Sequence, residues 1–125
     1  MISTRFFRTP LHEHADPAQR ILGVAELASD SDDLAKLLTQ DADAGVRAAA
    51  ARRSTHFAAL VAGWNAEKDP VVREALEASL APQVADSADG AAAKSVLEAE
   101  HTTDGLRAEV ARRTRDADRR ALALA

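Results

Sequence analysis

Two short groups of His and Glu side chains have the composition of metal ligands. His12, Glu13 and His14 are consecutive. In a helix, residues i and i+2 point in different directions, so a shared ion would need an irregular backbone and further ligands that the sequence does not supply. Glu98 and His101 have the i, i+3 spacing of carboxylate-bridged metal bundles, but such a site needs a second motif and two more acids. We predict no metal site and solvated side chains at both places.

Catalytic side chains are not arranged in a known motif. The 125 residues include no cysteine, so a thiol nucleophile, a thiolate metal site and a disulfide are excluded. No Ser or Thr lies in a nucleophile-elbow pattern, and there is no glycine-rich phosphate loop. We predict no catalytic and no cofactor-binding residue. An enzyme stays an alternative, because catalytic groups meet in space rather than in sequence.

Five arginines near the C-terminal end are the strongest candidates for binding: Arg112, Arg113, Arg115, Arg119 and Arg120. On one continuous helix, Arg112, Arg115 and Arg119 at i, i+3 and i+7 would present three guanidinium groups, which could hold the phosphates of a nucleic acid. Acidic residues are interspersed with them, and no aromatic residue is present to stack on bases. We favour a solvated or internally paired face, with nucleic acid and an acidic protein surface as alternatives.

Charge and composition predict one helical domain. The net charge is −4, and the chain has 30 Ala but only four aromatic residues. Alanine favours helices and lets them approach closely. Residues 104–125 hold six Arg against four acids and residues 1–8 hold two Arg and no acid, so the acidic excess lies between them. Because no secretory signal or membrane-spanning run is visible, we expect a cytoplasmic protein without a membrane partner.

A short sequence motif, which we call the phrase, recurs along the chain and organises the elements that carry these side chains. It consists of an Asp followed by an Arg four residues later, and its first three copies start 27 and 26 residues apart. A fixed period of this size is typical of stacked supersecondary units. A fourth copy is degraded, because its Asp is one residue closer to its Arg. The pairs are Asp16 and Arg20, Asp43 and Arg47, Asp69 and Arg73, and Asp104 and Arg107.

Apolar residues follow helical spacing between these phrases. Phe57, Leu60 and Trp64 fall at i, i+3 and i+7, the pattern of one buried helical face. Pro82 and Gly90 mark a loop insertion over 81–90. We expect one domain over 1–125, with an N-terminal extension over 1–13. The predicted helices span 17–28, 32–40, 44–54, 56–66, 70–80, a segment through 93–97 that ends near 101, and a last helix from about 104.

In its Asp-Pro-x-Val-Arg phrase followed by Ala-rich helix, the chain resembles the HEAT-like family of α-solenoid repeats, including the leucine-rich-repeat variant and the lyase-type HEAT repeats. The match covers residues 14–80 well and 91–125 weakly. The resemblance implies an all-α, right-handed, armadillo-like solenoid of about seven short helices. It also implies a ladder formed between successive turns by the Asp and Arg residues of the phrase.

Physical chemistry supports the same ladder, since each Arg can donate two hydrogen bonds to a carboxylate in the next unit. The iron–sulphur cluster of some variant-repeat proteins needs cysteines, so no cofactor is implied. The N-terminal stretch also resembles a repeat region of some large bacterial proteins, which suggests a bacterial chain.

We expect a helical-repeat scaffold without enzymatic activity that binds another protein or a domain of its own parent chain, because stacked helix pairs form an extended face. Trp64 would be the natural anchor if it is partly exposed, since aromatic residues dominate interface energies. Its spacing from Phe57 favours a core position instead. The alternatives are nucleic-acid binding through the five arginines and an enzyme of lyase-repeat type, which would need a pocket with convergent polar groups.

Replacing Asp69 by Ala tests the predicted helix start. The free energy of unfolding should fall by about 1 kcal/mol through the lost N-cap, and by more if the ladder is also broken. Urea denaturation of the wild type and the D69A variant measures the difference. Equal urea midpoints would mean that the helix begins elsewhere.

Overall fold

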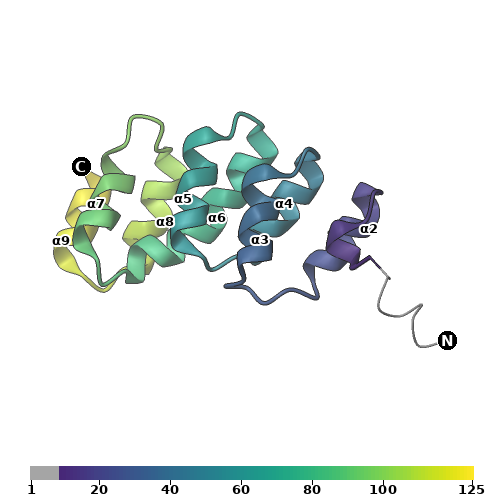
Figure 1. The fold of residues 1–125 in the computed structure, drawn as a ribbon. Helices are drawn as coiled ribbons and strands as arrows, with labels where there is room; N and C mark the ends of the chain where they lie inside the picture. The colour runs from purple at the N-terminus through teal and green to yellow at the C-terminus, as the bar shows by residue number, and fades with distance from the viewer. Residues whose placement is uncertain (1–8) are drawn as a thin grey trace.

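The computed structural model describes residues 9–125, and in this part of the chain every regular element is helical, so the all-α prediction is confirmed there. Residues 1–8 of the expected N-terminal extension lie outside the described residues, and Leu11–Glu13 form a short 3₁₀ helix, η1. The described α-helices, shown in Figure 1, are α2 (Pro17–Val24), α3 (Asp32–Gln40), α4 (Ala44–Arg53), α5 (Phe57–Ala66), α6 (Pro70–Asp86), α7 (Gly90–Glu98), α8 (Asp104–Arg113) and α9 (Ala117–Leu124).

A polar side chain caps the start of each of these α-helices by accepting a hydrogen bond from a backbone N–H of the first turn. Such caps satisfy donors that have no partner inside the helix. Proline follows the cap in α2 and α6, where its missing N–H costs no hydrogen bond. Local chemistry therefore sets the helix starts. The caps are Asp16, Ser31, Asp43, His56, Asp69, Asp89, Thr103 and Asp116.

The cap of α8 is Thr103, while Asp104 lies in the first turn of the helix. The Thr103 Oγ1 accepts a hydrogen bond from the Leu106 N–H at 3.1 Å. Because Arg107 follows this cap by four residues, the fourth copy of the phrase keeps the spacing of the other three. The expectation that Asp104 begins a shortened copy is wrong.

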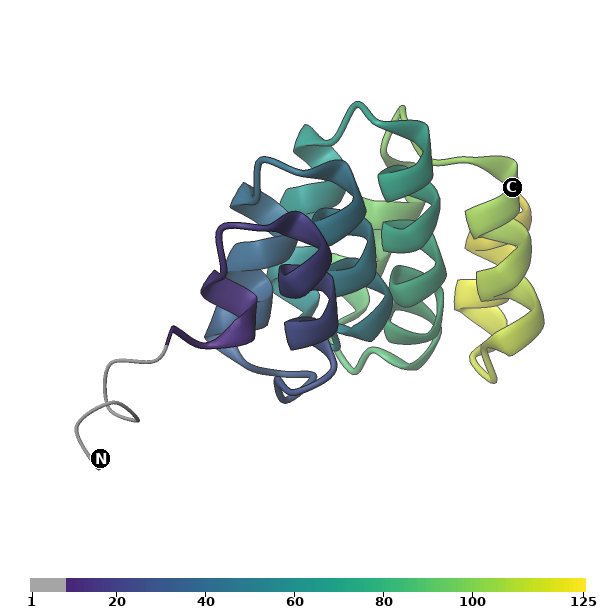
Figure 2. The same cartoon turned by 90° about the vertical axis from the view of Figure 1, so that its right-hand side faces the viewer.

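The helices form two layers. In one layer, α2, α4, α6 and α8 each pack against the next. In the other, α3 packs on α4 and α5, α5 packs on α6, and α9 packs on α7 and α8. Figures 1 and 2 show this arrangement from two sides, with α2 and α9 at opposite ends. The largest fully buried side chains fill the core: Trp64, Leu34, Leu38, Leu60, Leu76, Leu80 and Leu97.

At the α2 end, η1 packs closely on α2. Gly23 permits this approach, because a Cβ atom at that position would lie 2.3 Å from the backbone nitrogen of His12. Any larger residue would displace η1 from the helix. Among residues 9–125, no helix combines the length and the apolarity that crossing a membrane requires.

The helix α6 continues through the segment expected to be a loop. Pro82 lies inside the helix, so the predicted loop insertion over 81–90 is wrong, and 87–89 alone connect α6 to α7. Burial explains the continuation, because Leu80 and Val84 on either side of the proline are both 0% exposed. Burying each such side chain contributes about 1.5–3 kcal/mol, which offsets the cost of about 3 kcal/mol for a proline in a helix interior.

The longer spacing between Arg73 and Arg107 is therefore mainly helical. The helix α6 has 17 residues, against 10 in α4 and 10 in α8. A cleft of about 360 Å³ lies where this extension runs past the start of α5. It is lined by Phe57, Pro82, Gln83, Asp86 and Ser87.

The expected last helix is two helices, α8 and α9, so the described residues form eight α-helices rather than about seven. Thr114 ends α8. Its hydroxyl donates to the Ala85 carbonyl at 3.1 Å and accepts from the Asp116 N–H at 3.2 Å. Ser54 occupies the same place after α4, where its hydroxyl accepts from the His56 N–H at 3.1 Å. Both side chains are buried, and both turn the chain by satisfying a backbone N–H two residues later.

Replacing Pro82 by Ala tests whether the proline strains a helix that burial holds together. Alanine restores the missing N–H, so the free energy of unfolding should rise by roughly 1–3 kcal/mol. Thermal and urea unfolding followed by circular dichroism measure the change. A lower stability of the P82A variant would mean that the proline is needed for the native path of α6.

Candidate interaction surfaces

Arg20 links two successive loops at one edge of the molecule. Its Nη1 donates to the carbonyls of His14 and Ala15 at 2.9 and 3.0 Å, in the turn that precedes α2. Its Nε and Nη2 donate to the two carboxylate oxygens of Asp41 at 2.9 and 3.0 Å, in the loop between α3 and α4. The Asp41 side chain is only 7% exposed, so this bidentate pair is shielded from water.

Arg47 makes the same kind of link between the next two loops, the one before α4 and the one before α6. Its Nη1 donates to the Asp41 and Ala42 carbonyls, and its Nε and Nη2 donate to the Glu67 carboxylate at 2.8 and 3.2 Å. The acids of the ladder are therefore Asp41 and Glu67, which sequence reasoning missed. Each lies two residues before an Asp cap and also accepts that cap's backbone N–H. This acid-x-Asp spacing was the available signal.

Asp16, Asp43 and Asp69 act as caps instead of ladder acids. Arg73 meets no acid at the ladder position. Its Nη1 donates to the carbonyls of Trp64 and Glu67, and its Nη2 reaches the His101 carbonyl at 3.4 Å. We call Arg20, Arg47 and Arg73 the loop-linking arginines.

Trp64 is 1% exposed, so it belongs to the core, as its spacing from Phe57 predicts, and it is not available as an interface anchor. Its Nε1 donates to Glu77 at 2.9 Å, and Thr103 donates to the other carboxylate oxygen of Glu77 at 2.7 Å. The His101 ring lies 3.9 Å from the indole centroid, and the Arg73 guanidinium carbon lies 5.9 Å from it. This cluster joins α5, α6 and the loop before α8 where the acid of the ladder is missing.

The five C-terminal arginines do not share a helix face, because the chain turns at Thr114 between α8 and α9. Arg112 and Arg113 pair with Glu109. Arg119 donates to the carbonyls of Val84, Ala85 and Ser87 at the end of α6, and Arg120 donates to the carbonyls of Ala111 and Thr114 at the end of α8. Arg115 is exposed beside the turn. The predicted face of three guanidinium groups is wrong.

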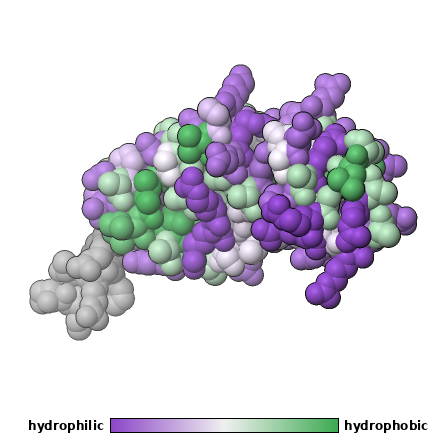
Figure 3. All heavy atoms as spheres, turned by 180° about the vertical axis from the view of Figure 1, so that it is seen from behind, coloured by the Kyte–Doolittle hydropathy of each residue, from purple (hydrophilic) through white to green (hydrophobic). Residues whose placement is uncertain are grey.

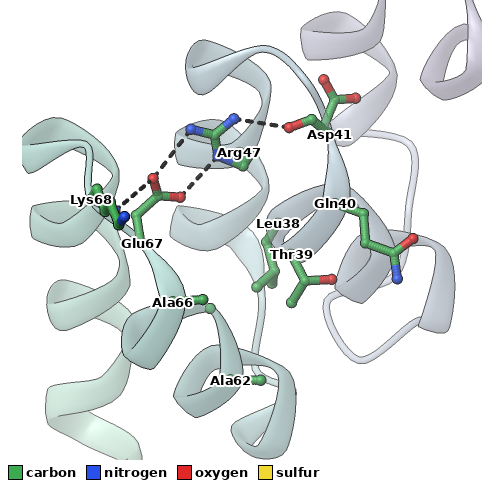
Figure 4. Close-up of a pocket in the computed structure, with 10 residues that line it drawn as sticks. Leu38, Thr39, Gln40, Asp41, Arg47, Ala62, Ala66, Glu67 and Lys68 are labelled. Atoms are coloured by element: carbon green, nitrogen blue, oxygen red, sulfur yellow. Dashed lines mark hydrogen bonds and ion pairs between the residues drawn. The ribbon is translucent and has the colours of Figure 1, made fainter.

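A cleft of about 410 Å³ lies between the ends of α3 and α5 (Figure 4). Arg47 and Glu67 line it, and the pKa of Glu67 is lowered mainly by the hydrogen bond from Arg47, against the raising effect of its burial. Both carboxylate oxygens are occupied, by Arg47 and by the N–H groups of Lys68 and Asp69. A carboxylate held ionised in this way is a poor proton acceptor, and the perturbed pKa follows from the ladder.

A smaller cleft, of about 190 Å³, lies between α6 and α8. Three Glu and three small or apolar residues line it: Glu74, Glu77, Ala78, Gly105, Leu106 and Glu109. On α6, Val71 precedes Glu74 and Ala78 at helical spacing and is 57% exposed. We call this cleft together with Val71 the α6–α8 face.

Other large apolar side chains are exposed at the two ends of the molecule. Ile21 and Leu22 of α2 are 39% and 59% exposed, and Leu124 of α9 is 69% exposed. Figure 3 shows hydrophobic surface gathered toward the end at which α2 lies.

The histidines of both groups considered as metal ligands have other contacts, and His101 of the second group packs against Trp64. His12 Nε2 lies 3.7 Å from a carboxylate oxygen of Glu13 and 3.8 Å from one of Asp33, while His14 Nδ1 accepts the Asp16 N–H. Across residues 9–125, no group of three or more His, Asp or Glu side chains is arranged to hold a metal ion. No protein-family model, no curated protein and no solved structure matches the chain.

Replacing Glu67 by Gln should make stability less dependent on pH in acid. Because the pKa of Glu67 is lower in the folded protein than its ordinary value of 4.5, its ion pair stabilises the fold above that pH. This contribution is lost as the pH falls through the lowered pKa. We expect the wild type to exceed the E67Q variant by roughly 1–3 kcal/mol at neutral pH, and the difference to shrink below about pH 4.

Urea denaturation at several pH values measures this difference. Glu100→Gln is the matched control, because Glu100 is exposed and makes no ladder contact. A difference between the wild type and E67Q that stays constant from neutral to acid pH would contradict the ion-pair explanation.

Proposed function

We propose that this chain is a right-handed, HEAT-like α-solenoid that acts as a non-enzymatic scaffold and binds another protein. The row formed by α2, α4, α6 and α8 and the recurring link between loops support a solenoid. In such a stack each unit contacts only its neighbours, and the outer faces of the helices are left to other molecules.

The observation that carries the proposal is the α6–α8 face. It combines an exposed Val71 with a cleft whose floor includes the buried Leu106. Two of the residues that line the cleft, Ala78 on α6 and Gly105 on α8, are small and leave it open to a partner side chain. Partner side chains that fill such a cleft are well placed to lose water, as binding hot spots require.

The charges of this face favour a partner with basic groups around an apolar side chain. Glu109 is already paired with Arg112 and Arg113, and Glu77 accepts from Trp64 and Thr103. Glu74 makes no such contact with the described residues and is exposed at the rim. A Lys or Arg of the partner beside Glu74 would steer association more than it would add affinity.

The two alternative functions have less support. Arg119 and Arg120 cap helix ends and Arg112 and Arg113 pair with Glu109, which weakens nucleic-acid binding through the five arginines. An enzyme of lyase-repeat type would use the cleft beside Glu67, whose oxygens are occupied by ladder contacts.

Site-specific photo-crosslinking tests the proposed surface. A photoreactive residue at position 78 lies in the α6–α8 face, and one at position 58 lies on an exposed part of α5 in the other layer. In the native cell we expect a discrete protein adduct from position 78 and none from position 58.

Adding Val71→Glu should reduce the yield at position 78 by about tenfold, because a buried interface anchor contributes more than about 1 kcal/mol. The adduct protein, once purified, should bind the wild type directly and bind V71E more weakly. Equal adducts from positions 58 and 78, or an adduct unaffected by V71E, would contradict the assignment of this face.

A further inference from the structure

The α9 end of the molecule exposes a side chain that the repeat buries elsewhere. Leu124 lies eight residues after the cap of its helix, as Trp64 does in α5 and Leu97 does in α7. Trp64 and Leu97 are 1% and 0% exposed, because neighbouring helices cover them. Leu124 is 69% exposed. In the repeat geometry, the place beside Leu124 is one that helices of another unit would occupy.

The same end carries Arg107 at the position of the loop-linking arginines. Arg20 and Arg47 each bind a carboxylate in the following unit. Among the described residues, no carboxylate lies within ion-pair distance of the Arg107 guanidinium. The Arg107 side chain is half-buried.

The α2 end also exposes an apolar side chain at a position that is buried in another helix. Leu22 lies six residues after its cap, where α6 has Ala75. Ala75 is 2% exposed, whereas Leu22 is 59% exposed and Ile21 beside it is 39% exposed. Leu22 therefore occupies a position that is buried in α6, and it is exposed together with the adjacent Ile21.

The two ends are complementary in charge. Residues 1–33, which include the sequence of the α2 end, hold six carboxylates against three Arg, so this part of the chain is acidic. Residues 104–125, which form the α8–α9 end, hold six Arg against four carboxylates. These ends lie at opposite extremes of the molecule, so one copy cannot bring them together (Figure 1).

We propose that the α8–α9 end of one copy packs on the η1–α2 end of a second copy, head to tail. Leu124 covers the apolar side chains of α2, and Arg107 approaches the acids at the start of the chain, among them Glu13, whose side chain is 61% exposed. This contact joins two different surfaces, so it leaves one end free on each outer copy and the assembly can grow. The contact is separate from the α6–α8 face.

Sedimentation velocity of the 125-residue protein over a wide concentration range tests the proposal. The mass should rise above the 13.3 kDa of one chain as concentration increases, without stopping at a dimer. Added salt should weaken association, because charge complementarity contributes to it. A monomer at all concentrations and salt levels overturns the proposal.

Two end-blocking variants separate head-to-tail packing from other arrangements. Leu124→Glu blocks the α9 end and Leu22→Glu blocks the α2 end, so each variant alone should associate at least about tenfold more weakly. An equimolar mixture should form pairs that grow no further, because each variant keeps one intact and complementary end.

If L124E alone still dimerises and the mixture gains nothing, like ends pair with like ends and the proposal is overturned. Both substitutions fall on exposed side chains. Far-UV circular dichroism and the fluorescence of Trp64, the only tryptophan, check that each variant is folded before its mass is interpreted.

Discussion

The repeated guanidinium link between successive loops is the interaction on which this architecture depends. Each helix pair has too little apolar surface to be stable alone, and thirty alanines give the layers small contacts. Arg20 and Arg47 each bind carbonyls of one loop and a carboxylate of the next, so one side chain fixes the distance between two units. Removing either partner would leave a charged group poorly solvated, which makes the spacing specific.

Where the ladder loses its acid, other chemistry takes over. Glu67 has no counterpart beside Arg73, and the loop before α8 is longer. There His101 packs against Trp64, with the two rings tilted by 38°, while Thr103 and Trp64 share Glu77. At the opposite edge, Arg119 binds the carbonyls that end α6. Two of the five arginines that the sequence offers for binding, Arg119 and Arg120, therefore serve helix ends, because a guanidinium satisfies several carbonyls at once.

The sequence predicted the helical class, most helix starts and the Asp-to-Arg spacing, because caps and periodicity act locally. It did not reveal Asp41 and Glu67 as ladder acids, since their partners lie 20 or more residues away. At Pro82 the sequence predicted a helix end that the structure does not have, and at Thr114 it failed to predict one that the structure has. Burial of Val84 outweighs the local preference of the proline for a break, whereas Thr114 breaks a helix that periodicity alone continues, by bonding to Ala85. In both cases tertiary contacts decided.

The length of α6 also has a geometric consequence. At 17 residues it exceeds α4 and α8 by seven, which advances the start of α7 by about 10 Å along the helix axis. The end of α6 therefore extends beyond the end of α4, and the cleft lined by Phe57 lies beside this extension.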